Sequence, residues 1–195
     1  MSRLLIAAPM RLEALLIRSA GPGLAVHRTG MGPRRAQAAA GMLLGRPGDA
    51  LVVLGFCGGL DERSRPGEVV VAEQVLAAAD EGHQADEVRC VGVEALTGAL
   101  ERRGLQVRSG PIVCVSRLVL GERRAELHEG GAIAVDMESV WLAAGAGGRP
   151  FATVRVVLDS PSHELLRPQA AAGALRAARA LRRVAAALHE WTPAG

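Results

Sequence analysis

Short apolar runs alternate with helix-patterned segments along this chain, and that alternation constrains the fold more than any other feature. The runs Leu4–Ala8, Leu51–Leu54 and Phe151–Leu158 show almost no alternation of polar and apolar residues. Strands of this kind are buried on both faces, as in parallel sheets that helices cover on either side. We therefore predict an α/β fold, a three-layer sandwich with a mostly parallel central sheet, in which residues 1–195 form a single domain.

The other elements follow from turn residues and helical spacing. The segment Ala77–Val91 is polar and weakly patterned, so we predict a loop there. Pro33 suits the first turn of the helix that follows it. Further strands are predicted at Leu24–Val26, Gly67–Val71, Ile112–Val115 and Ile133–Val135, and helices at Met10–Arg18, Arg34–Leu44, Val93–Arg103, Glu138–Ala146 and Pro168–Trp191.

The composition excludes several chemistries. All 23 basic residues are arginine, and the chain has no lysine, asparagine or tyrosine. A lysine Schiff base, a P-loop lysine and a tyrosine acid are therefore ruled out. The formal net charge is only +3, and two Trp and two Phe are too few for a base-stacking surface. We expect no nucleic-acid partner.

The cysteines favour a reducing compartment. Cys57, Cys90 and Cys114 form no CxxC pair and show no metal-ligand spacing with the five histidines, so we expect no metal and no cofactor. Sparse, unpaired thiols are typical of the cytoplasm. The sequence shows no signal-peptide pattern and no apolar run of membrane-spanning length. The expectation is a soluble, cytoplasmic protein.

Carboxylates follow the predicted strand ends. Ligands of open α/β sheets bind beyond the carboxyl ends of the strands, and Glu13, Asp136, Glu138 and Asp159 each come after such an end. Carboxylates there suit acid–base work on a neutral or cation-forming substrate. The last three are equally well explained as helix caps or turn residues, and spacing alone favours neither interpretation.

Two glycine motifs lie at the same predicted edge. The sequence GMG at residues 30–32 is similar to the start of a dinucleotide fingerprint, but Arg35 stands in place of the third glycine. A turn with positive φ angles explains it better. Residues 55–60 read GFCGGL, in which glycines either admit a ligand close to the backbone or serve a tight loop. With no charge or histidine nearby in the sequence, Cys57 is interpreted as a small buried hydrophobe rather than a nucleophile.

These motifs, in their order along nearly the whole chain, resemble the nucleoside phosphorylase superfamily and, within it, the methylthioadenosine/S-adenosylhomocysteine nucleosidases. The block DMES at residues 136–139 and the pair Arg155-x-x-x-Asp159 are the more specific matches. The short length and the GFxGGL pattern are similar to the hopanoid-associated subgroup, which acts on adenosylhopane. The other matching segments are APMRLE at 8–13, TGMG at 29–32, GFCGGL at 55–60 and PGEVVV at 66–71.

The resemblance implies a role for each candidate residue. Asp159 would protonate the purine at N7 and make it a leaving group, and Glu13 would hold and activate the attacking water. Glu138 would bind the ribose 2′- and 3′-hydroxyls, with Met137 packing beneath the sugar. The cleavage passes through an oxocarbenium-like state, which carboxylates stabilise, and a largely apolar pocket would keep the acid protonated. The purine would lie against Leu118, Val119, Cys57 and Gly58.

The resemblance also bears on the nucleophile. Phosphorylases have an arginine before, and a Ser or Thr after, the glycine at the third strand end, where this chain has Val53 and Phe56. With Glu13 present, this pattern favours hydrolysis over phosphorolysis. The remaining candidates for phosphate ligands are better explained as exposed arginines near helix starts: Arg11, Arg28, Arg34 and Arg35.

The substrate and the partners stay open at this point. Adenosylhopane is favoured, while methylthioadenosine, S-adenosylhomocysteine and futalosine compete with it; a phosphorylase or a non-catalytic nucleoside-binding protein is the alternative. The segment 72–108 is shorter than in the nucleosidases, which implies a more open site or one completed by a partner subunit, and a homodimer is expected. A solvated helix face, or else a basic surface contacting an anionic membrane, explains Arg176, Arg179, Arg182 and Arg183.

Overall fold

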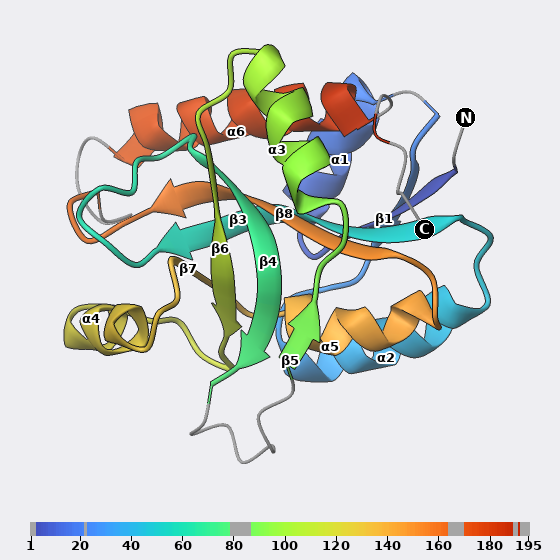
Figure 1. Ribbon diagram of the computed structural model, residues 1–195, viewed down its shortest axis with the longest axis horizontal. Helices are drawn as coiled ribbons and strands as arrows, with labels where there is room; N and C mark the ends of the chain where they lie inside the picture. The colour runs from blue at the N-terminus through green and yellow to red at the C-terminus, as the bar shows by residue number, and fades with distance from the viewer. Residues whose placement is uncertain (1–2, 22, 79–86, 164–169, 189–190, 192–195) are drawn as a thin grey trace.

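The computed structural model describes residues 3–21, 23–78, 87–163, 170–188 and 191. Within these ranges eight strands form one sheet in the order β2-β1-β3-β7-β6-β4-β5, and β8 pairs with both β3 and β4 (Figure 1). The pairing therefore closes a ring of β3, β8, β4, β6 and β7. The strands are β1 (Leu4–Ala8), β2 (Ala25–Arg28), β3 (Ala50–Gly59), β4 (Val69–Ala77), β5 (Glu87–Arg89), β6 (Val107–Cys114), β7 (Ala134–Asp136) and β8 (Phe151–Asp159).

Most of these strand pairs are parallel, as predicted, and the antiparallel ones are β3–β7, β4–β5 and β4–β8. Strand β8 runs parallel to β3 and antiparallel to β4, where Val70 lies opposite Arg155. A register shift between Cys57 and Gly58 of β3 then brings Gly58 opposite Asp159. The strand that carries Arg155 and Asp159 is thus hydrogen-bonded on both sides.

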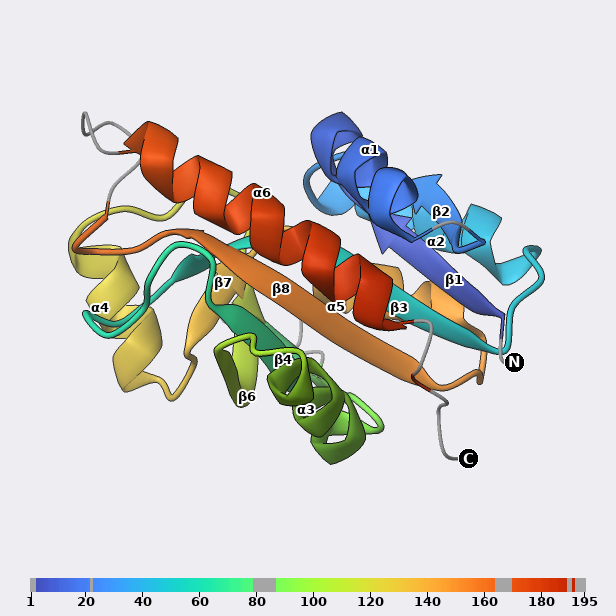
Figure 2. The same cartoon turned by 90° about the horizontal axis from the view of Figure 1, so that it is seen from above.

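Helices cover both faces of the sheet and complete the three predicted layers (Figure 1). Figure 2 looks down on one helical layer and shows α6 lying along β8. Helices α1, α3 and α6 pack on one face, and α2 and α5 with the 3₁₀-helix η2 pack on the other (Figure 1). Helix α4 lies beside the carboxyl ends of β3 and β8. The bounds are α1 (Arg11–Ala20), α2 (Pro33–Leu44), α3 (Val93–Arg102), α4 (Glu122–Glu129), α5 (Ser139–Ala143), η2 (Ala144–Ala146) and α6 (Ala170–Ala187).

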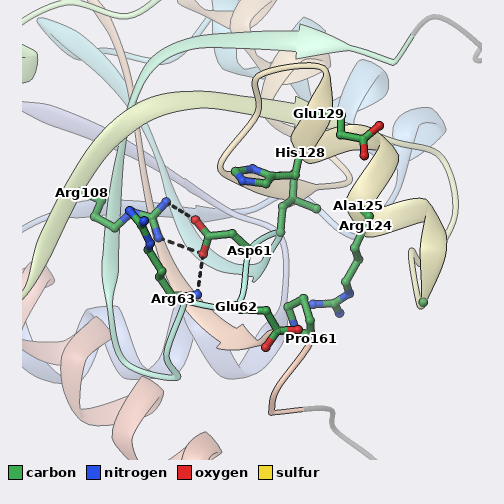
Figure 3. A pocket seen from close by; sticks show the side chains of 11 residues that line it. Asp61, Glu62, Arg63, Arg108, Arg124, Ala125, His128, Glu129 and Pro161 are labelled. Carbon is green, nitrogen blue, oxygen red and sulfur yellow. Dashed lines mark hydrogen bonds and ion pairs between the residues drawn. The ribbon is translucent and has the colours of Figure 1, made fainter.

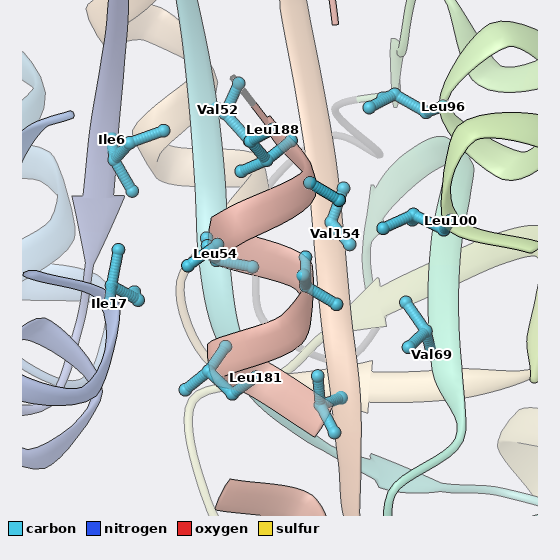
Figure 4. Packing of buried hydrophobic residues seen from close by; sticks show 14 of the residues in the cluster. Ile6, Ile17, Val52, Leu54, Val69, Leu96, Leu100, Val154, Leu181 and Leu188 are labelled. Atoms are coloured by element: carbon cyan, nitrogen blue, oxygen red, sulfur yellow. The ribbon is translucent and has the colours of Figure 1, made fainter. Parts of the chain in front are cut away.

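The larger apolar core lies between the sheet and the helices α1, α3 and α6. Leu54 of β3 and Val154 of β8 are fully buried there with Leu181 of α6 and Ile17 of α1 (Figure 4). Each such side chain contributes about 1.5–3 kcal/mol by leaving water. Small buried residues such as Ala177 let α6 approach the sheet closely. Among the helices of the described ranges, none is long and apolar enough to span a bilayer.

Several boundaries differ from the sequence prediction. Strand β3 runs through Gly59 instead of ending at Gly55, because closure of the ring gives these glycines partners in β7 and β8. The predicted loop Ala77–Val91 contains β5, which pairs with β4. Helix α4 was not predicted, since its sequence ERRAELHE is polar on nearly all sides. Within the predicted helix Pro168–Trp191, residues 168–169 and 189–190 lie outside the described residues.

Candidate active site

The carboxyl ends of β1, β3, β7 and β8 surround a cleft of about 150 Å³. This is the edge of the sheet at which α/β proteins bind ligands. The wall is mostly apolar and includes Met10, Phe56 and Leu158. Residues far apart in the sequence are therefore brought to one place. All eight candidate residues line this cleft: Glu13, Cys57, Gly58, Leu118, Val119, Met137, Glu138 and Asp159.

Glu13 is held by the backbone on two sides. Its carboxylate accepts the Met10 N–H at 2.6 Å and the Phe56 N–H at 2.6 Å, and the residue is only 1% exposed. Burial raises the pKa of Glu13, while the nearby positive charge of Arg155 lowers it. Because each carboxylate oxygen has a second lone pair, Glu13 can still accept a hydrogen bond from a water in the cleft.

Gly55 makes the approach of Glu13 to the sheet feasible. A Cβ at this position would lie 2.5 Å from Glu13 Oε1 and 2.8 Å from Arg155 Nη1. Real Cβ atoms do not come so close to other heavy atoms, so a side chain here would displace one of the two charged groups. The glycine of the GFCGGL motif is therefore required for close packing inside a strand, and the expectation of a loop there is wrong.

Arg155 is the hub of a buried ionic network. Its Nε donates to Asp136 Oδ2 at 2.8 Å, and its Nη2 donates to Ser139 Oγ at 3.0 Å and to Glu138 Oε2 at 3.4 Å. A fully buried guanidinium is tolerated only when it is paired in this way. Although Arg155 belongs to a recognised motif, sequence reasoning gave it no role. The available signal was a charged residue inside an otherwise apolar strand.

The two carboxylates of the DMES block have different roles in the structure. Asp136 Oδ1 accepts the backbone N–H groups of Glu138 and Ser139, so Asp136 holds the turn that leads into α5, whose N-cap residue is Glu138. Glu138 instead accepts the N–H of Gly32, 106 residues away, at 2.9 Å. Burial raises the pKa of Glu138 to about 7, although Arg155 opposes this rise. Glu138 is thus aimed into the cleft, next to Met137.

Asp159 is buried and makes an ion pair with Arg124 of α4. Arg124 also donates to the carbonyl of Gly59 at 2.8 Å and to that of Val119 at 3.2 Å. A guanidinium stabilises the charged form of a neighbouring carboxylate. Arg124 places a positive charge beside this carboxyl, which the expectation of a largely apolar pocket did not include. Arg124 lies in a polar, weakly patterned segment, so nothing in the sequence indicated that it would pair with Asp159.

The candidate base-contacting residues form one side of the cleft. Cys57 is buried, and this burial raises the pKa of its thiol, which fits a small buried hydrophobe and not a nucleophile. Charges do lie around this thiol in space, Asp136 and Asp159 among them, which the sequence neighbourhood did not indicate. Leu118 is 68% exposed at the mouth of the cleft, whereas Val119 is buried below it.

The arginines considered as phosphate ligands lie elsewhere. Arg11, Arg28, Arg34 and Arg35 are exposed and do not line the cleft. Val53 is fully buried in the core, while Phe56 lines the cleft. Of the cleft-lining arginines in the described chain, Arg124 already carries an ion pair and Arg117 lies near the mouth.

A second, open hollow of about 830 Å³ lies on the other side of Arg124 (Figure 3). Asp61 and Arg108 form an ion pair at 2.8 Å in its wall, and this pairing, with bonds from Ser64, lowers the pKa of Asp61 despite the opposing effect of burial. His128 and Glu129 of α4 also line it. Arg124 lines both hollows.

Solved structures with the same fold include several nucleosidases. The 5′-methylthioadenosine/S-adenosylhomocysteine nucleosidase of Neisseria meningitidis, in complex with methylthio-immucillin-A, is 20% identical with a TM-score of 0.79, over 98% of this chain and 100% of that one. The futalosine hydrolase of Helicobacter pylori is 17% identical with a TM-score of 0.77, over 96% and 95%. The S-adenosylhomocysteine nucleosidase of Streptococcus pyogenes, with 5-methylthiotubericidin, is 18% identical with a TM-score of 0.76, over 95% and 96%.

At such identities the likeness establishes the shared fold. No significant match is found among curated protein sequences. The model of one protein family, described as the phosphorylase superfamily, matches residues 11–188 and so covers most of the sequence. The match includes all eight candidate residues of the cleft, with Glu13 near its start and Asp159 toward its end. This chain belongs to the phosphorylase superfamily.

Proposed function

We propose that the protein hydrolyses the N-ribosidic bond of a 5′-substituted adenine nucleoside and releases adenine. The observation that carries the proposal is the convergence of three buried carboxylates, Glu13, Glu138 and Asp159, on one apolar cleft. They come from α1, from the start of α5 and from the end of β8. Cleavage of a glycosidic bond needs acid assistance at the leaving group and negative charge near the sugar.

Each carboxylate has a role in the proposed reaction. Asp159 donates a proton to N7 of the purine, and the electron pair of the C1′–N9 bond leaves with the base. Glu138 accepts hydrogen bonds from the ribose hydroxyls above Met137. Glu13 orients a water that adds to C1′ and removes its proton. Leu118, Val119, Cys57 and Gly58 form the wall against which the purine packs.

Water is favoured over phosphate as the nucleophile. A phosphate site needs several convergent cationic and hydroxyl donors. The candidate arginines near helix starts lie outside the cleft, and the buried cations Arg124 and Arg155 are already paired with carboxylates. Phe56 also occupies a position where a phosphate ligand would be expected. Phosphorolysis remains the alternative that the assay below distinguishes.

Within this substrate class we favour adenosylhopane, over methylthioadenosine, S-adenosylhomocysteine and futalosine. The support is the GFxGGL pattern of the hopanoid-associated subgroup and the apolar mouth of the cleft. Met31 and Leu118 line that mouth and are 50% and 68% exposed. An apolar 5′ group would cover surface that is otherwise left in contact with water.

A lipid-linked substrate extends the proposal to the surface of the protein. Four arginines lie on the exposed face of α6, opposite the buried Leu181. We propose that this face contacts anionic membranes weakly and that the protein acts in the cytoplasm as a homodimer. Flotation with vesicles of phosphatidylglycerol tests the contact, and light scattering tests the oligomer. The four residues are Arg176, Arg179, Arg182 and Arg183.

The deciding experiment measures adenine release from four 5′-substituted adenosines, with and without phosphate. We expect phosphate-independent release, fastest with the most apolar 5′ group. Asp159→Asn should lower kcat by about 10²–10⁴-fold with an unchanged circular dichroism spectrum. A rate that depends on phosphate would indicate a phosphorylase, and tight binding without turnover a binding protein. Normal turnover by Asp159→Asn would overturn the assignment of the acid.

A further inference from the structure

Arg124 has no part in the reaction described so far, although it touches the proposed acid. Its side chain is 3% exposed and makes three contacts: an ion pair with Asp159, a hydrogen bond to the Gly59 carbonyl and a hydrogen bond to the Val119 carbonyl. The three partners belong to β8, β3 and the segment before α4. A planar guanidinium held on three sides has one orientation.

We propose that Arg124 is a positioning residue, which fixes the Asp159 carboxyl toward the cleft and sets the pH range in which that carboxyl carries the proton for the leaving base. The inference rests on the proposed function, because it concerns the acid of that reaction. The motifs that resemble the family do not include helix α4, so the resemblance gives no role to Arg124.

The electrostatic argument follows from burial. A positive charge within hydrogen-bond distance favours the ionised carboxyl, and the effect is stronger in an apolar setting than in water. Asp159 is therefore a stronger acid beside Arg124 than it would be alone. It gives its proton more readily to the weakly basic N7, but it is protonated only at lower pH. Removing the charge should reverse both effects.

Other charged and titratable groups surround the cleft and the hollow behind it. Arg155, on the same strand as Asp159, is engaged by Asp136 and Glu138. The other charged and titratable groups that line the cleft and the hollow are Glu13 of α1, Cys57 of β3, Asp61, Glu62 and Arg63 after β3, Arg108 of β6, Arg117 after β6, His128 and Glu129 of α4, Asp136 of β7 and Glu138 before α5. Arg124 differs from these in its direct ion pair with the proposed acid.

The contact with Val119 adds a geometric role. Val119 belongs to the wall proposed for the purine, and Arg124 ties its carbonyl to the same guanidinium that holds Asp159. The spacing between the base wall and the acid is therefore set by one side chain. Arg124 also lines the open hollow that contains Asp61 and His128, so this one side chain borders both the cleft and that hollow.

The test compares Arg124→Met, which removes the charge, with Arg124→Lys, which keeps it. Arg123→Met is the matched control, because Arg123 is the preceding residue of α4 and pairs with Glu126 at the surface. The pH dependence of kcat/KM for adenine release should show an alkaline limb from loss of the Asp159 proton. In Arg124→Met we expect that limb about 1–3 pH units higher. In Arg124→Lys and Arg123→Met it should stay within about half a unit.

A second readout does not depend on activity. Carbon-13 NMR of protein labelled at aspartate carboxyls follows the titration of Asp159, whose signal is the one missing in Asp159→Asn. The titration should move to higher pH in Arg124→Met by the same amount. If Arg124→Met does not fold, Arg124→Gln removes the charge and keeps an N–H donor for the Gly59 carbonyl.

The outcomes separate the two proposals. Unchanged titration in a folded Arg124→Met or Arg124→Gln protein, or an equal shift in Arg123→Met, overturns the role of Arg124. Absence of adenine release by the wild-type protein overturns the proposed function, and the NMR titration then still decides whether Arg124 governs Asp159. A shifted titration together with a shifted alkaline limb supports both.

Discussion

Replacing Gly55 by alanine places a methyl group where the protein has no room for one. The added Cβ would lie 2.5 Å from Glu13 Oε1, 2.7 Å from Glu13 Cδ and 2.8 Å from Arg155 Nη1. Neither side chain is free to turn away. The Glu13 carboxylate accepts two backbone N–H groups, and Arg155 is held by Asp136 and Ser139. The substitution therefore has to break part of the buried network.

The magnitude follows from these contacts. Overpacking a buried site costs roughly 1–3 kcal/mol. Displacing Glu13 leaves the N–H of Met10 or of Phe56 buried without its acceptor, which costs about 1–3 kcal/mol more. We expect the free energy of unfolding to fall by about 2–6 kcal/mol, and Tm by roughly 5–20 °C for a chain of this length. Adenine release should fall with it, because Glu13 leaves its position.

Urea denaturation followed by circular dichroism measures the change. Gly41→Ala is the control, since Gly41 is exposed on α2 and nothing lies within 4 Å of its added Cβ; it should be neutral or up to about 1 kcal/mol more stable. In a Glu13→Ala background the main clash is gone, so Gly55→Ala should cost at least about 1 kcal/mol less than in the wild-type protein. Equal costs in the two backgrounds would refute the reasoning.

Three further predictions concern the buried charges and thiols. Burial raises the pKa of Glu138 from 4.5 to about 7, so between these pH values the folded protein keeps a proton on Glu138 that the unfolded chain has lost. The free energy of unfolding should therefore fall as the pH rises from 5 to 8. Urea denaturation at pH 5 and pH 8 measures this fall, which should be smaller in Glu138→Gln. Arg155→Met leaves Asp136 and Glu138 without their shared cation, and the free energy of unfolding should fall by about 3–5 kcal/mol in the same measurement. A fall below about 1 kcal/mol would contradict the idea that Arg155 holds these carboxylates together. Burial raises the thiol pKa values of Cys57 and Cys114, so a disulfide reagent at pH 8 should label them only after unfolding, which mass spectrometry detects.

The sequence predicts the parts of this molecule that depend on local pattern. The apolar runs Leu4–Ala8 and Phe151–Leu158 agree closely with β1 and β8, and carboxylates at strand ends do meet at one cleft. What the pattern misses is long-range pairing. Neither the ion pair of Arg124 with Asp159 nor the bond from Gly32 to Glu138 has a local signature, because each joins segments that only the closed sheet brings together.

The extent of β3 was mispredicted for the same reason. Glycine weakens an isolated strand, so Gly55 and Gly59 suggest a loop when they are considered alone. In the protein β8 and β7 supply partners for the glycine-rich end, and the lack of side chains becomes a requirement of the packing around Glu13. The polar helix α4 was missed because its place depends on Arg124 reaching inward and not on an apolar face.

The position of β8 inside the closed ring determines how the site can move. Arg155 and the residues beside it are paired on one edge with β3 and on the other with β4. Amides in such a strand exchange with solvent only when the whole domain opens, whereas the segments that frame the mouth, Leu118 among them, are free to open on their own. Hydrogen exchange should therefore divide the cleft into a floor with the stability of the entire protein and a rim that opens far more often. In the reaction proposed above, substrate entry and product release would then involve the rim, while the residues of the floor would keep their arrangement.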